Sequence, residues 1–293
     1  MNGKYSDLGY GNITSILGYK PESNTGLMNV AKTYDTNPAK QYYFGGWYTD
    51  AACTQAYDPA TYTPAENATE IVLYAKWNEK AKVTFSDGSY MTTITLFAKP
   101  GGNVTAPSAT ASRWYNANKT AVITTLSGDS VVKFTFKNWT NGTETVNANG
   151  SYTVNKNVAD GTVIAFTAQF SETTYYKVAV SAKACGSCGG NYTTTVTLSI
   201  NGDIVGTNGN TPSNLSTQGK SGKEATGTYY ATGKVTIEIS FDHKFMIISS
   251  HSNSYNVTGG SNCSSGSGSG KNDSTHTITV DATAAIQITA KAG

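Results

Sequence analysis

Charged residues are scarce in this sequence, and their scarcity limits what the chain can bind. They make up 14% of the 293 residues, and the net charge is +2, whereas about 25% is usual for a soluble domain. Binding of nucleic acid or of an anionic membrane needs a clustered basic face, which this chain does not indicate. We therefore expect no nucleic-acid partner and a surface built mainly from Thr, Ser, Asn, Gly and Tyr.

Long apolar runs are also missing. No run approaches the roughly 20 residues that span a bilayer, so we expect no membrane insertion. No charged segment followed by an apolar stretch opens the chain, as a secretory signal would. Two explanations stay open. Either the sequence is part of a longer secreted protein with Met1 added for expression, or it is a complete reading frame that never uses a secretory signal.

Residues typical of catalytic sites are few. The three histidines belong to no H-E-x-x-H motif and no nucleophile elbow. A glycosidase pair could join carboxylates that are distant in the chain, but no sequence feature indicates one. No set of residues supplies a nucleophile, a base and oxyanion donors together. We expect a protein that is not an enzyme, with no catalytic residues, no metal and no cofactor.

Only four cysteines occur, and two of them form the motif Cys185-x-x-Cys188. A redox site would place this motif at the start of a helix, but strand-like sequence flanks it here. Zinc would need four ligands, drawn from Cys185, Cys188, Cys263 and either His251 or His276, without a second paired motif. The favoured prediction is a disulfide from Cys263 to Cys188 or Cys185, which leaves Cys53 as a lone thiol.

The clearest pattern lies in residues 42–77. Alternation in Ile71–Trp77 places Ile71, Leu73, Ala75 and Trp77 on one face of a strand, because successive side chains point to opposite faces. Upstream, the glycine pair in Phe44-Gly45-Gly46-Trp47 predicts a bulge or a close backbone approach between two large aromatic residues.

This pattern, F-x-G-W-Y-T-D followed by Y-D and L-Y-A-K-W, resembles the Listeria–Bacteroides repeat, the internalin B-repeat-like module of bacterial surface proteins. The resemblance is specific over roughly forty residues. It implies a β-grasp-type fold and a role in surface display and adhesion.

Similar strand endings occur twice more, at Ile164–Phe170 and Ile286–Ala292. The motif Phe44–Trp47 is echoed at Phe136–Trp139 and more faintly at Phe245–Ile248. These endings are farther apart than the 20 to 50 residues of a solenoid repeat, so they predict separate small domains. We expect an N-terminal arm plus a clear repeat module at 1–79, and divergent modules at 80–172 and 173–293, the last with a Gly/Ser-rich insert.

The expected fold class is all-β, or β-rich α+β, with three tandem small β-grasp-like or β-sandwich-like domains. Alternating side chains predict a hairpin of Val83–Phe85 and Thr93–Ala98 around the turn at 86–89. Strands are also expected at Tyr176–Ala182 and at Lys234–Phe241, the latter with Val235, Ile237, Ile239 and Phe241 on one face. Only residues 25–33 show any helical periodicity. We read Asn201-Gly202-Asp203 and Asn208-Gly209-Asn210 as turns rather than calcium sites, and Gly259–Lys271 as a flexible loop. The predicted structural core consists of Phe44, Trp47, Leu73, Trp77, Phe136, Trp139, Phe166, Phe170, Ile286 and Ile288.

The segment before the repeat has one apolar cluster, from Ile13 to Tyr19. It is either a divergent first strand or a docking arm that uses Ile13, Ile16, Leu17 and Tyr19. If this segment is a docking arm, we expect a virion surface protein, such as a phage capsid decoration or fibre component, bound to protein subunits of a larger assembly. The alternative is a segment of a bacterial cell-surface adhesin. Abundant tyrosine with Thr and Asn suits surface glycans as a second class of partner.

Overall fold

The computed structural model of the chain describes residues 3–4, 12–13, 40–58, 61–63, 72–185, 193–213, 216–220, 222–244, 252–271 and 273–292. Every regular element in these stretches is a strand, and none of them contains a helix. The prediction of an all-β fold is confirmed. The weakly helical pattern at 25–33 and the faint third echo at 245–248 lie outside the described residues.

The chain forms two compact units. Unit 1 comprises residues 1–110 and 137–169, and unit 2 comprises residues 111–136 and 170–293. Strands β10 (Ser130–Thr140) and β13 (Val163–Lys183) contribute residues to both units. The division into three domains stays a prediction, because unit 1 holds more than one separate sheet.

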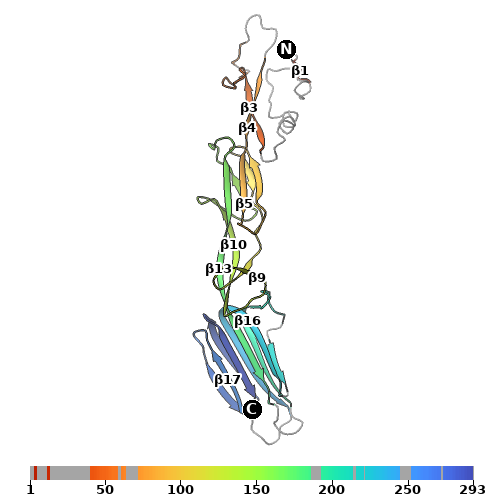
Figure 1. Cartoon of the computed structure of the whole chain (residues 1–293), viewed down its shortest axis with the longest axis vertical. Helices are drawn as coiled ribbons and strands as arrows, with labels where there is room; N and C mark the ends of the chain where they lie inside the picture. The colour runs from red at the N-terminus through yellow and green to blue at the C-terminus, as the bar shows by residue number, and fades with distance from the viewer. Residues whose placement is uncertain are drawn as a thin grey trace. The chain divides into compact units, whose positions relative to one another are not determined.

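Unit 1 is built from short strands (Figure 1). Besides its parts of β10 and β13, it contains β1 (Gly3–Lys4), β2 (Asn12–Ile13), β3 (Tyr42–Tyr48), β4 (Tyr74–Glu79), β5 (Ala81–Ser86), β6 (Ile94–Ala98), β7 (Asn103–Thr105), β11 (Thr145–Val146) and β12 (Ser151–Thr153). Strands β1 and β2, β3 and β4, and β7 and β12 form three two-stranded sheets. The hairpin of β5 and β6 was expected from alternation around the turn at 86–89 and is confirmed.

Unit 2 has the longer strands (Figure 1). It contains β8 (Arg113–Asn116), β9 (Val122–Ile123), β14 (Thr193–Gly206), β15 (Ser216–Lys220), β16 (Glu224–Lys244), β17 (Ser252–Thr258), β18 (Ser267–Lys271), β19 (Ser274–Ala282) and β20 (Ile286–Ala292), with its parts of β10 and β13. Strand β16 lies between β14 and β13 in the strand order, and it also pairs with β19.

The predicted bulge in Phe44–Trp47 is confirmed. Strands β3 and β4 pair antiparallel, and their register shifts between Phe44 and Gly46, where φ of Gly46 is 120°. The partner strand begins at Tyr74, so the strand predicted from Ile71 starts later than expected: Val72 and Leu73 precede it, and Ile71 lies outside the described residues. Alternation alone could not show where pairing starts, because the pattern is the same whether or not a partner strand lies beside it.

Aromatic rings fill the core of unit 1. Phe85 stacks on Phe166 with ring centroids 5.1 Å apart, and the edge of Trp139 meets Phe85 at 5.4 Å. Tyr152 also contacts Phe166, at 4.8 Å. The indole Nε1 of Trp139 donates to the carbonyl oxygen of Pro107 at 3.2 Å, so burial leaves its one polar atom satisfied. Strands β5, β10, β12 and β13 are thereby packed around one cluster.

The strand predicted to end at Phe170 is longer than expected. It is part of β13, which continues to Lys183. The alternation of buried and less buried side chains is interrupted after Phe170 and returns from Val178 to Lys183, and Tyr176–Lys183 pairs antiparallel with Glu224–Ala231 of β16. One continuous strand therefore serves as the last strand of unit 1 and as the first long strand of unit 2.

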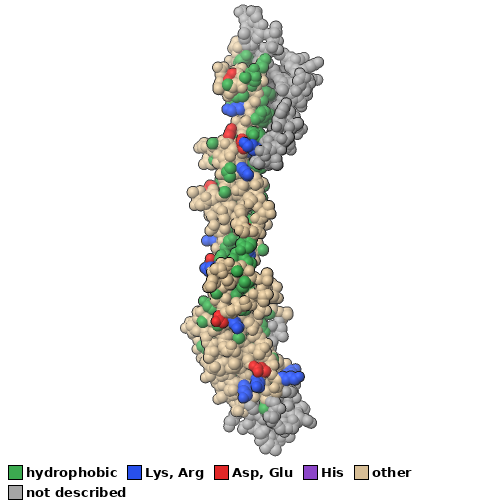
Figure 2. Space-filling view, viewed as in Figure 1, with side chains coloured by type: hydrophobic (Ala, Val, Ile, Leu, Met, Phe, Trp, Pro, Cys, Tyr) green, Lys and Arg blue, Asp and Glu red, His purple; other side chains and the backbone are tan. Residues whose placement is uncertain are grey.

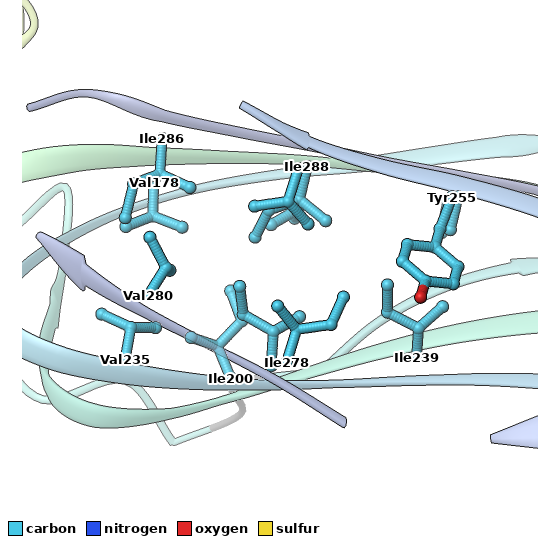
Figure 3. Packing of buried hydrophobic residues seen from close by; sticks show 14 of the residues in the cluster. Val178, Ile200, Val235, Ile239, Tyr255, Ile278, Val280, Ile286 and Ile288 are labelled. Carbon is cyan, nitrogen blue, oxygen red and sulfur yellow. The ribbon is translucent and has the colours of Figure 1, made fainter. Parts of the chain in front are cut away.

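Two layers of strands enclose the core of unit 2. Figure 3 shows Val178, Ile286, Ile288 and Tyr255, from β13, β20 and β17, facing residues of β14, β16 and β19. The predicted alternation in β16 is confirmed, because its core-facing side chains are all buried: Val235, Ile237, Ile239 and Phe241. Burial of one face of each layer by β-branched residues is typical of a β-sandwich.

The two layers are connected where strands bend. Strand β16 pairs with β13 up to Ala231 and with β19 from Gly233, which has φ of 69°. Opposite this point, β14 is bulged between Asn201 and Asp203, and φ of Gly202 is 147°. The prediction of a turn at Asn201-Gly202-Asp203 is therefore wrong. These residues form a bulge inside a strand, and bulges allow a strand to pass from one sheet to another.

The other two predictions about glycine-rich segments have different outcomes. Asn208-Gly209-Asn210 is a turn, as predicted: Gly209 N donates to Gly206 O at 2.9 Å. The segment Gly259–Lys271 is only partly loop. Its C-terminal part, Ser267–Lys271, is strand β18, which pairs with Ser252–Asn256 of β17. Glycine and serine composition did not show this strand, because backbone pairing does not require apolar side chains.

Candidate functional site

The visible surface is mainly polar and uncharged. Figure 2 shows lysine, arginine and acidic side chains scattered among side chains that are neither charged nor hydrophobic. Ion pairs that the structure describes lie at the surface, as with Lys40 and Glu79 at 2.9 Å and with Lys119 and Glu172. Such pairs contribute little to stability. Contacts of this surface would rely on amide and hydroxyl hydrogen bonds and on aromatic rings.

In unit 1, the strand that follows the sheet of β3 and β4 lies next to the strand through which the chain last leaves the unit. We call them the incoming and outgoing strands of this part of the chain. Residues Lys82–Ser86 of β5 pair in parallel with Val163–Thr167 of β13, residue by residue. The pair is packed into the core through Phe85 and Phe166. Since the strands are parallel, the chain enters at one end of this pair and leaves at the other.

Unit 2 repeats the arrangement with different strands. Residues 111–136 of unit 2 come earlier in the chain. Where the chain enters unit 2 for the last time, the incoming strand is the second part of β13, and the outgoing strand is β20. Val178–Lys183 pairs in parallel with Ile286–Lys291. The inward residues of both strands are buried in the same cluster, for example Val180 and Ile288. The predicted similarity of the strand endings at 164–170 and 286–292 thus corresponds to a shared place in the topology: both are outgoing strands paired in parallel with an incoming strand.

A second feature of unit 2 is an aromatic face, which we define as Arg113, Tyr115, Phe134, Phe136 and Phe170. All five side chains are half-buried. The rings of Tyr115 and Phe134 are 4.5 Å apart, and Phe170 is 6.3 Å from the rings of both Phe134 and Phe136. The guanidinium of Arg113 lies 5.3 Å from the centroid of Phe170, within the range of a cation–π contact.

The sequence indicated only part of this aromatic face. Phe136 and Phe170 were predicted as core residues, but both are half-buried. Arg113, Tyr115 and Phe134 were missed. A signal was present, because Arg113-Trp114-Tyr115 and Phe134-Thr135-Phe136 both alternate large side chains on one face of a strand. Aromatic and arginine side chains together are enriched at recognition surfaces.

On the opposite side of β8, the side chains belong to the interior. Trp114 packs against the cluster of Leu126, Val131, Tyr175, Val205 and Tyr230. The ring of Trp114 meets that of Tyr175 at 5.0 Å, and Lys133 Nζ lies 5.3 Å from the Trp114 ring centroid. Burial, with the nearby charge of Asp129, raises the pKa of Tyr230, whose hydroxyl donates to Gly128 O at 2.9 Å. These residues support the fold of unit 2.

The described residues contain no group of three or more His, Cys, Asp or Glu side chains that could hold a metal ion. His276 contacts the rings of Tyr255 at 4.7 Å and Phe241 at 6.2 Å. No hydrogen-bond partner for its buried Nε2 occurs among the described residues. His251 lies outside them. What the structure shows of His276 is a ring packed at the edge of the core.

The predicted disulfide to Cys263 is wrong. Cys263 is an exposed free thiol whose Sγ donates to Ser265 O, and Cys53 is also free. Cys185 is disulfide-bonded, and Cys188 lies outside the described residues. The register explains the outcome. Cys263 follows β17 near the Ile286 end of β20, whereas Cys185 follows β13 beyond the Lys291 end. These ends are about 16 Å apart along the strands, far beyond disulfide reach.

The other predicted core residues differ in burial. Trp47, Trp139, Phe166, Ile286 and Ile288 are buried. Phe44, Leu73 and Trp77 are half-buried, in or next to the small sheet of β3 and β4. There, Phe44 contacts Trp47 and Trp77 edge-on, with centroids 5.4 and 5.6 Å apart. A two-stranded sheet has too little apolar surface to cover all of its aromatic rings.

Little of the predicted docking arm can be placed. Ile13 is in β2, paired with Gly3 of β1. Ile16, Leu17 and Tyr19 lie outside the described residues. The docking arm therefore stays a prediction.

No protein-family model matches the chain, and no curated protein matches it. The solved structures that are similar to it include two major pilin proteins. One is the major pilin protein T3.2 from Streptococcus pyogenes serotype GAS13637, with 12% identity, a TM-score of 0.22, and coverage of 86% of this chain and 90% of that chain. The other is the major pilin protein T-13 from Streptococcus pyogenes serotype GAS131465, with 10% identity, a TM-score of 0.18, and coverage of 69% and 72%. TM-scores this low identify neither a fold family nor a function. No helix in the described part of the chain is long and apolar enough to span a bilayer.

Proposed function

We propose that the chain is a non-enzymatic structural and attachment protein displayed on an exterior surface. The observation that carries this proposal is the parallel pairing of incoming and outgoing strands in each unit. The chain enters unit 2 for the last time at Phe170, and its last strand ends beside Lys183, at the other end of the same strand β13. At about 3.3 Å per residue, the two points are held about 40 Å apart. Such a unit keeps the segments joined to its two ends apart, as a spacer does.

The composition of the surface supports the same function. A displayed spacer must stay soluble and must not bind unspecifically to charged partners. A surface with few charges and with many hydroxyl and amide groups meets the second requirement, because it carries no clustered field of one sign. The aromatic face of unit 2 adds ring and guanidinium groups suited to stacking on sugars or on a partner protein.

More specifically, we propose a component of a phage virion surface, docked on protein subunits of a larger assembly through its N-terminal region. The apolar cluster of Ile13, Ile16, Leu17 and Tyr19 would supply the contacts. A second candidate is a segment of a secreted bacterial cell-surface adhesin, which is favoured by the resemblance of residues 42–77 to the Listeria–Bacteroides repeat.

Immunogold electron microscopy distinguishes these candidates. Antibodies against the full chain would be applied to intact cells of the source organism and to purified virions from the same culture. Label on virions supports the virion component, and label on intact cells supports the adhesin. Label confined to permeabilised cells would contradict both. A variant with Ile16→Asp and Leu17→Asp tests the docking arm, since it should lose incorporation into virions, whereas Thr93→Asp, an exposed change in unit 1, should not.

Surface glycans are the second partner that we propose. The test is binding of the purified chain to immobilised mucin and to a glycan array. Tyr115→Ala and Arg113→Ala should weaken binding if the aromatic face is the contact. Tyr90→Ala is a matched control, because Tyr90 is an exposed tyrosine of unit 1. Equal losses for Tyr90 and Tyr115 would contradict the aromatic face as the site.

A further inference from the structure

The pairing of incoming and outgoing strands has a mechanical consequence within each unit. When the chain is pulled from its two sides, force along the chain reaches residues 170–293 of unit 2 at Phe170, within β13, and leaves at the C-terminal end of β20. These strands are parallel, so the force pulls them in opposite directions along their length. Sliding them apart loads every pair from Val178–Ile286 to Lys183–Lys291 at the same time.

Antiparallel neighbours respond differently when the load acts across one end of their ladder. In β16 and β19, Phe241 pairs with Ser274 at the end of the ladder. Force that separates this end breaks the pairs one after another, so each bond is loaded alone. A single backbone hydrogen bond contributes little net free energy by itself. Bonds that must break together therefore give a much higher barrier than bonds that break in sequence.

Packing protects the parallel pairs of unit 2. Val178, Val180 and Ala182 of β13 are buried, as are Ile286, Ile288 and Ala290 of β20. Both strands also have a second neighbour, since β13 pairs with β16 and β20 pairs with β17. Sliding would move interlocked apolar side chains past one another and would expose them to water. This adds to the barrier that the hydrogen bonds set.

Unit 1 has a similar pair. Force along the chain would reach this pair at the N-terminal end of β5, after the sheet of β3 and β4, and leave through β13, so that the pairs from Lys82–Val163 to Ser86–Thr167 are sheared together. The stacked rings of Phe85 and Phe166, both almost fully buried, lie within this ladder. The same mechanical arrangement thus occurs in successive parts of the chain, built from different residues.

From these observations, we propose that the parallel pairs β5 with β13 and β13 with β20 are mechanical clamps, which make this chain a load-bearing tether. This function deepens the proposed role in attachment and rests on it. It concerns resistance to pulling along the chain, which is the direction of force on any protein that holds two bodies together.

Single-molecule force spectroscopy of the full chain tests the proposal. In the first geometry, handles are fused to the two ends of the chain. In the second, handles are attached at Asp242→Cys and Asp273→Cys, two exposed positions next to the end of the β16 and β19 ladder, in a background with Cys53→Ser and Cys263→Ser. Unit 2 is recognised in the first geometry by a length gain of roughly 400 Å, from residues 170–293.

We expect the rupture force of unit 2 in the first geometry to be at least about twofold that in the second at the same loading rate, because forced unfolding follows the unfolding rate under load. Equal or lower force in the end-to-end geometry would overturn the clamp.

Two engineered disulfides, which we call staples, test which strand pair sets the barrier to forced unfolding of unit 2. Ser181→Cys with Thr289→Cys joins register partners of β13 and β20, and Glu238→Cys with Thr277→Cys joins register partners of β16 and β19. Neighbouring strands are close enough for such bridges. Under end-to-end load, the oxidised staple of the clamp should abolish rupture of unit 2. The control staple should leave the rupture force unchanged and shorten the length gain by roughly 130 Å.

A rupture force that rises with the control staple would place the barrier outside the clamp and overturn the proposal. Thermal unfolding of each oxidised variant checks that it is folded before it is pulled. The outcomes are separable from those for the proposed function. Low end-to-end force would contradict the clamp while leaving surface display intact, and absence of the chain from virions and cell surfaces would contradict display while leaving the measured mechanics intact.

Discussion

Tyr175 donates its hydroxyl hydrogen to Asp203 in unit 2, with its Oη 3.1 Å from each carboxylate oxygen. The tyrosine is buried beside Trp114 and Val205. Burial, together with the negative charge of Asp203, raises the pKa of Tyr175 to about 12. Asp203 is the residue directly after the bulge at Gly202, so the bulge in β14 aims this carboxylate at the tyrosine.

This pair gives unit 2 a pH dependence above pH 10. The folded state holds the Tyr175 proton more tightly than the unfolded state, in which the pKa is about 10. Its contribution to stability is complete below about pH 10 and is lost as the pH rises from 10 to 12. In Tyr175→Phe, we expect the free energy of unfolding to be lower at neutral pH than in the unmutated chain by about 1–2 kcal/mol. Between pH 10 and 12 it should fall less steeply than in the unmutated chain.

Urea unfolding at a series of pH values measures both effects. Tyr176→Phe is a suitable control, since Tyr176 is the adjacent, half-buried tyrosine. Parallel pH profiles for Tyr175→Phe and the unmutated chain would show that this hydrogen bond does not control the dependence.

Two glycines lie at the bend between the two layers of unit 2, and replacing each by alanine should lower the free energy of unfolding by a different amount. Both have positive φ, 147° at Gly202 and 69° at Gly233. A Cβ on Gly202 would lie 2.8 Å from the carbonyl oxygen of Lys234, but a Cβ on Gly233 meets nothing within 4 Å. Gly233→Ala should therefore cost about 1–2 kcal/mol for the backbone conformation alone. Gly202→Ala should cost more, about 2–4 kcal/mol, because backbone must also move.

Thermal or urea unfolding of the two variants, side by side, checks this order. The reverse order, or equal losses, would mean that the close approach of Lys234 does not constrain the bulge.

Alternation of residue types predicted much of this fold. It placed strands at Val83–Phe85, at Tyr176–Ala182 and at Lys234–Phe241, because one buried face imposes a period of two. The glycine pair before Trp47 predicted the bulge in β3. Alternation could not show that β13 continues past Phe170, because the pattern of a strand does not reveal where its partner changes from β5 to β16 and β20.

The candidate sites were harder to predict, because they depend on pairing between distant segments. The repeated strand endings indicated a shared design, yet only the register shows that both are outgoing strands in parallel with incoming ones. The aromatic face joins residues of β8, β10 and β13. The disulfide prediction failed because the sequence does not show that Cys185 and Cys263 lie near opposite ends of β20. In each case, the missing information was which strands are neighbours.

Trp139 should be the most sensitive aromatic residue of unit 1. It is fully buried, contacts Phe85 and donates to Pro107 O. Trp139→Ala should destabilise unit 1 by about 3–5 kcal/mol through the cavity that it leaves. Trp77→Ala should cost less, because Trp77 is half-buried in a two-stranded sheet. Chemical denaturation monitored by circular dichroism compares them. A larger loss for Trp77 would contradict the assignment of the core to the cluster around Phe85.

The loop with Asp50 should lose its local structure in acid. Backbone and side-chain hydrogen bonds from Gln55 and Thr54 lower the pKa of Asp50, with Gln55 N 2.7 Å from the carboxylate. A lowered folded pKa means that the contribution is present above the ordinary value near 3.8 and is lost as the pH falls below it. After correction for intrinsic rates, the Gln55 amide should therefore lose protection from hydrogen exchange in acid.

The amide of Tyr57 is the internal reference for this measurement, because it donates to the carbonyl oxygen of Trp47 rather than to a carboxylate. Asp50→Asn should remove the difference between Gln55 and Tyr57. Equal protection of the two amides at every pH would mean that the Asp50 carboxylate does not hold the loop.

Cys263 and Cys185 should differ in reactivity. Cys263 is an exposed free thiol, whereas Cys185 is disulfide-bonded. Without reductant, alkylation of the native protein by iodoacetamide should modify Cys263 first and leave Cys185 unmodified, as peptide mass spectrometry would show. Because Cys263 is exposed and its hydrogen bond to Ser265 O is a weak one, Cys263→Ser should change the free energy of unfolding by less than about 0.5 kcal/mol. Protection of Cys263 from alkylation, or a loss of several times that amount, would mean that the thiol is engaged in the folded protein and that its loop is part of the core.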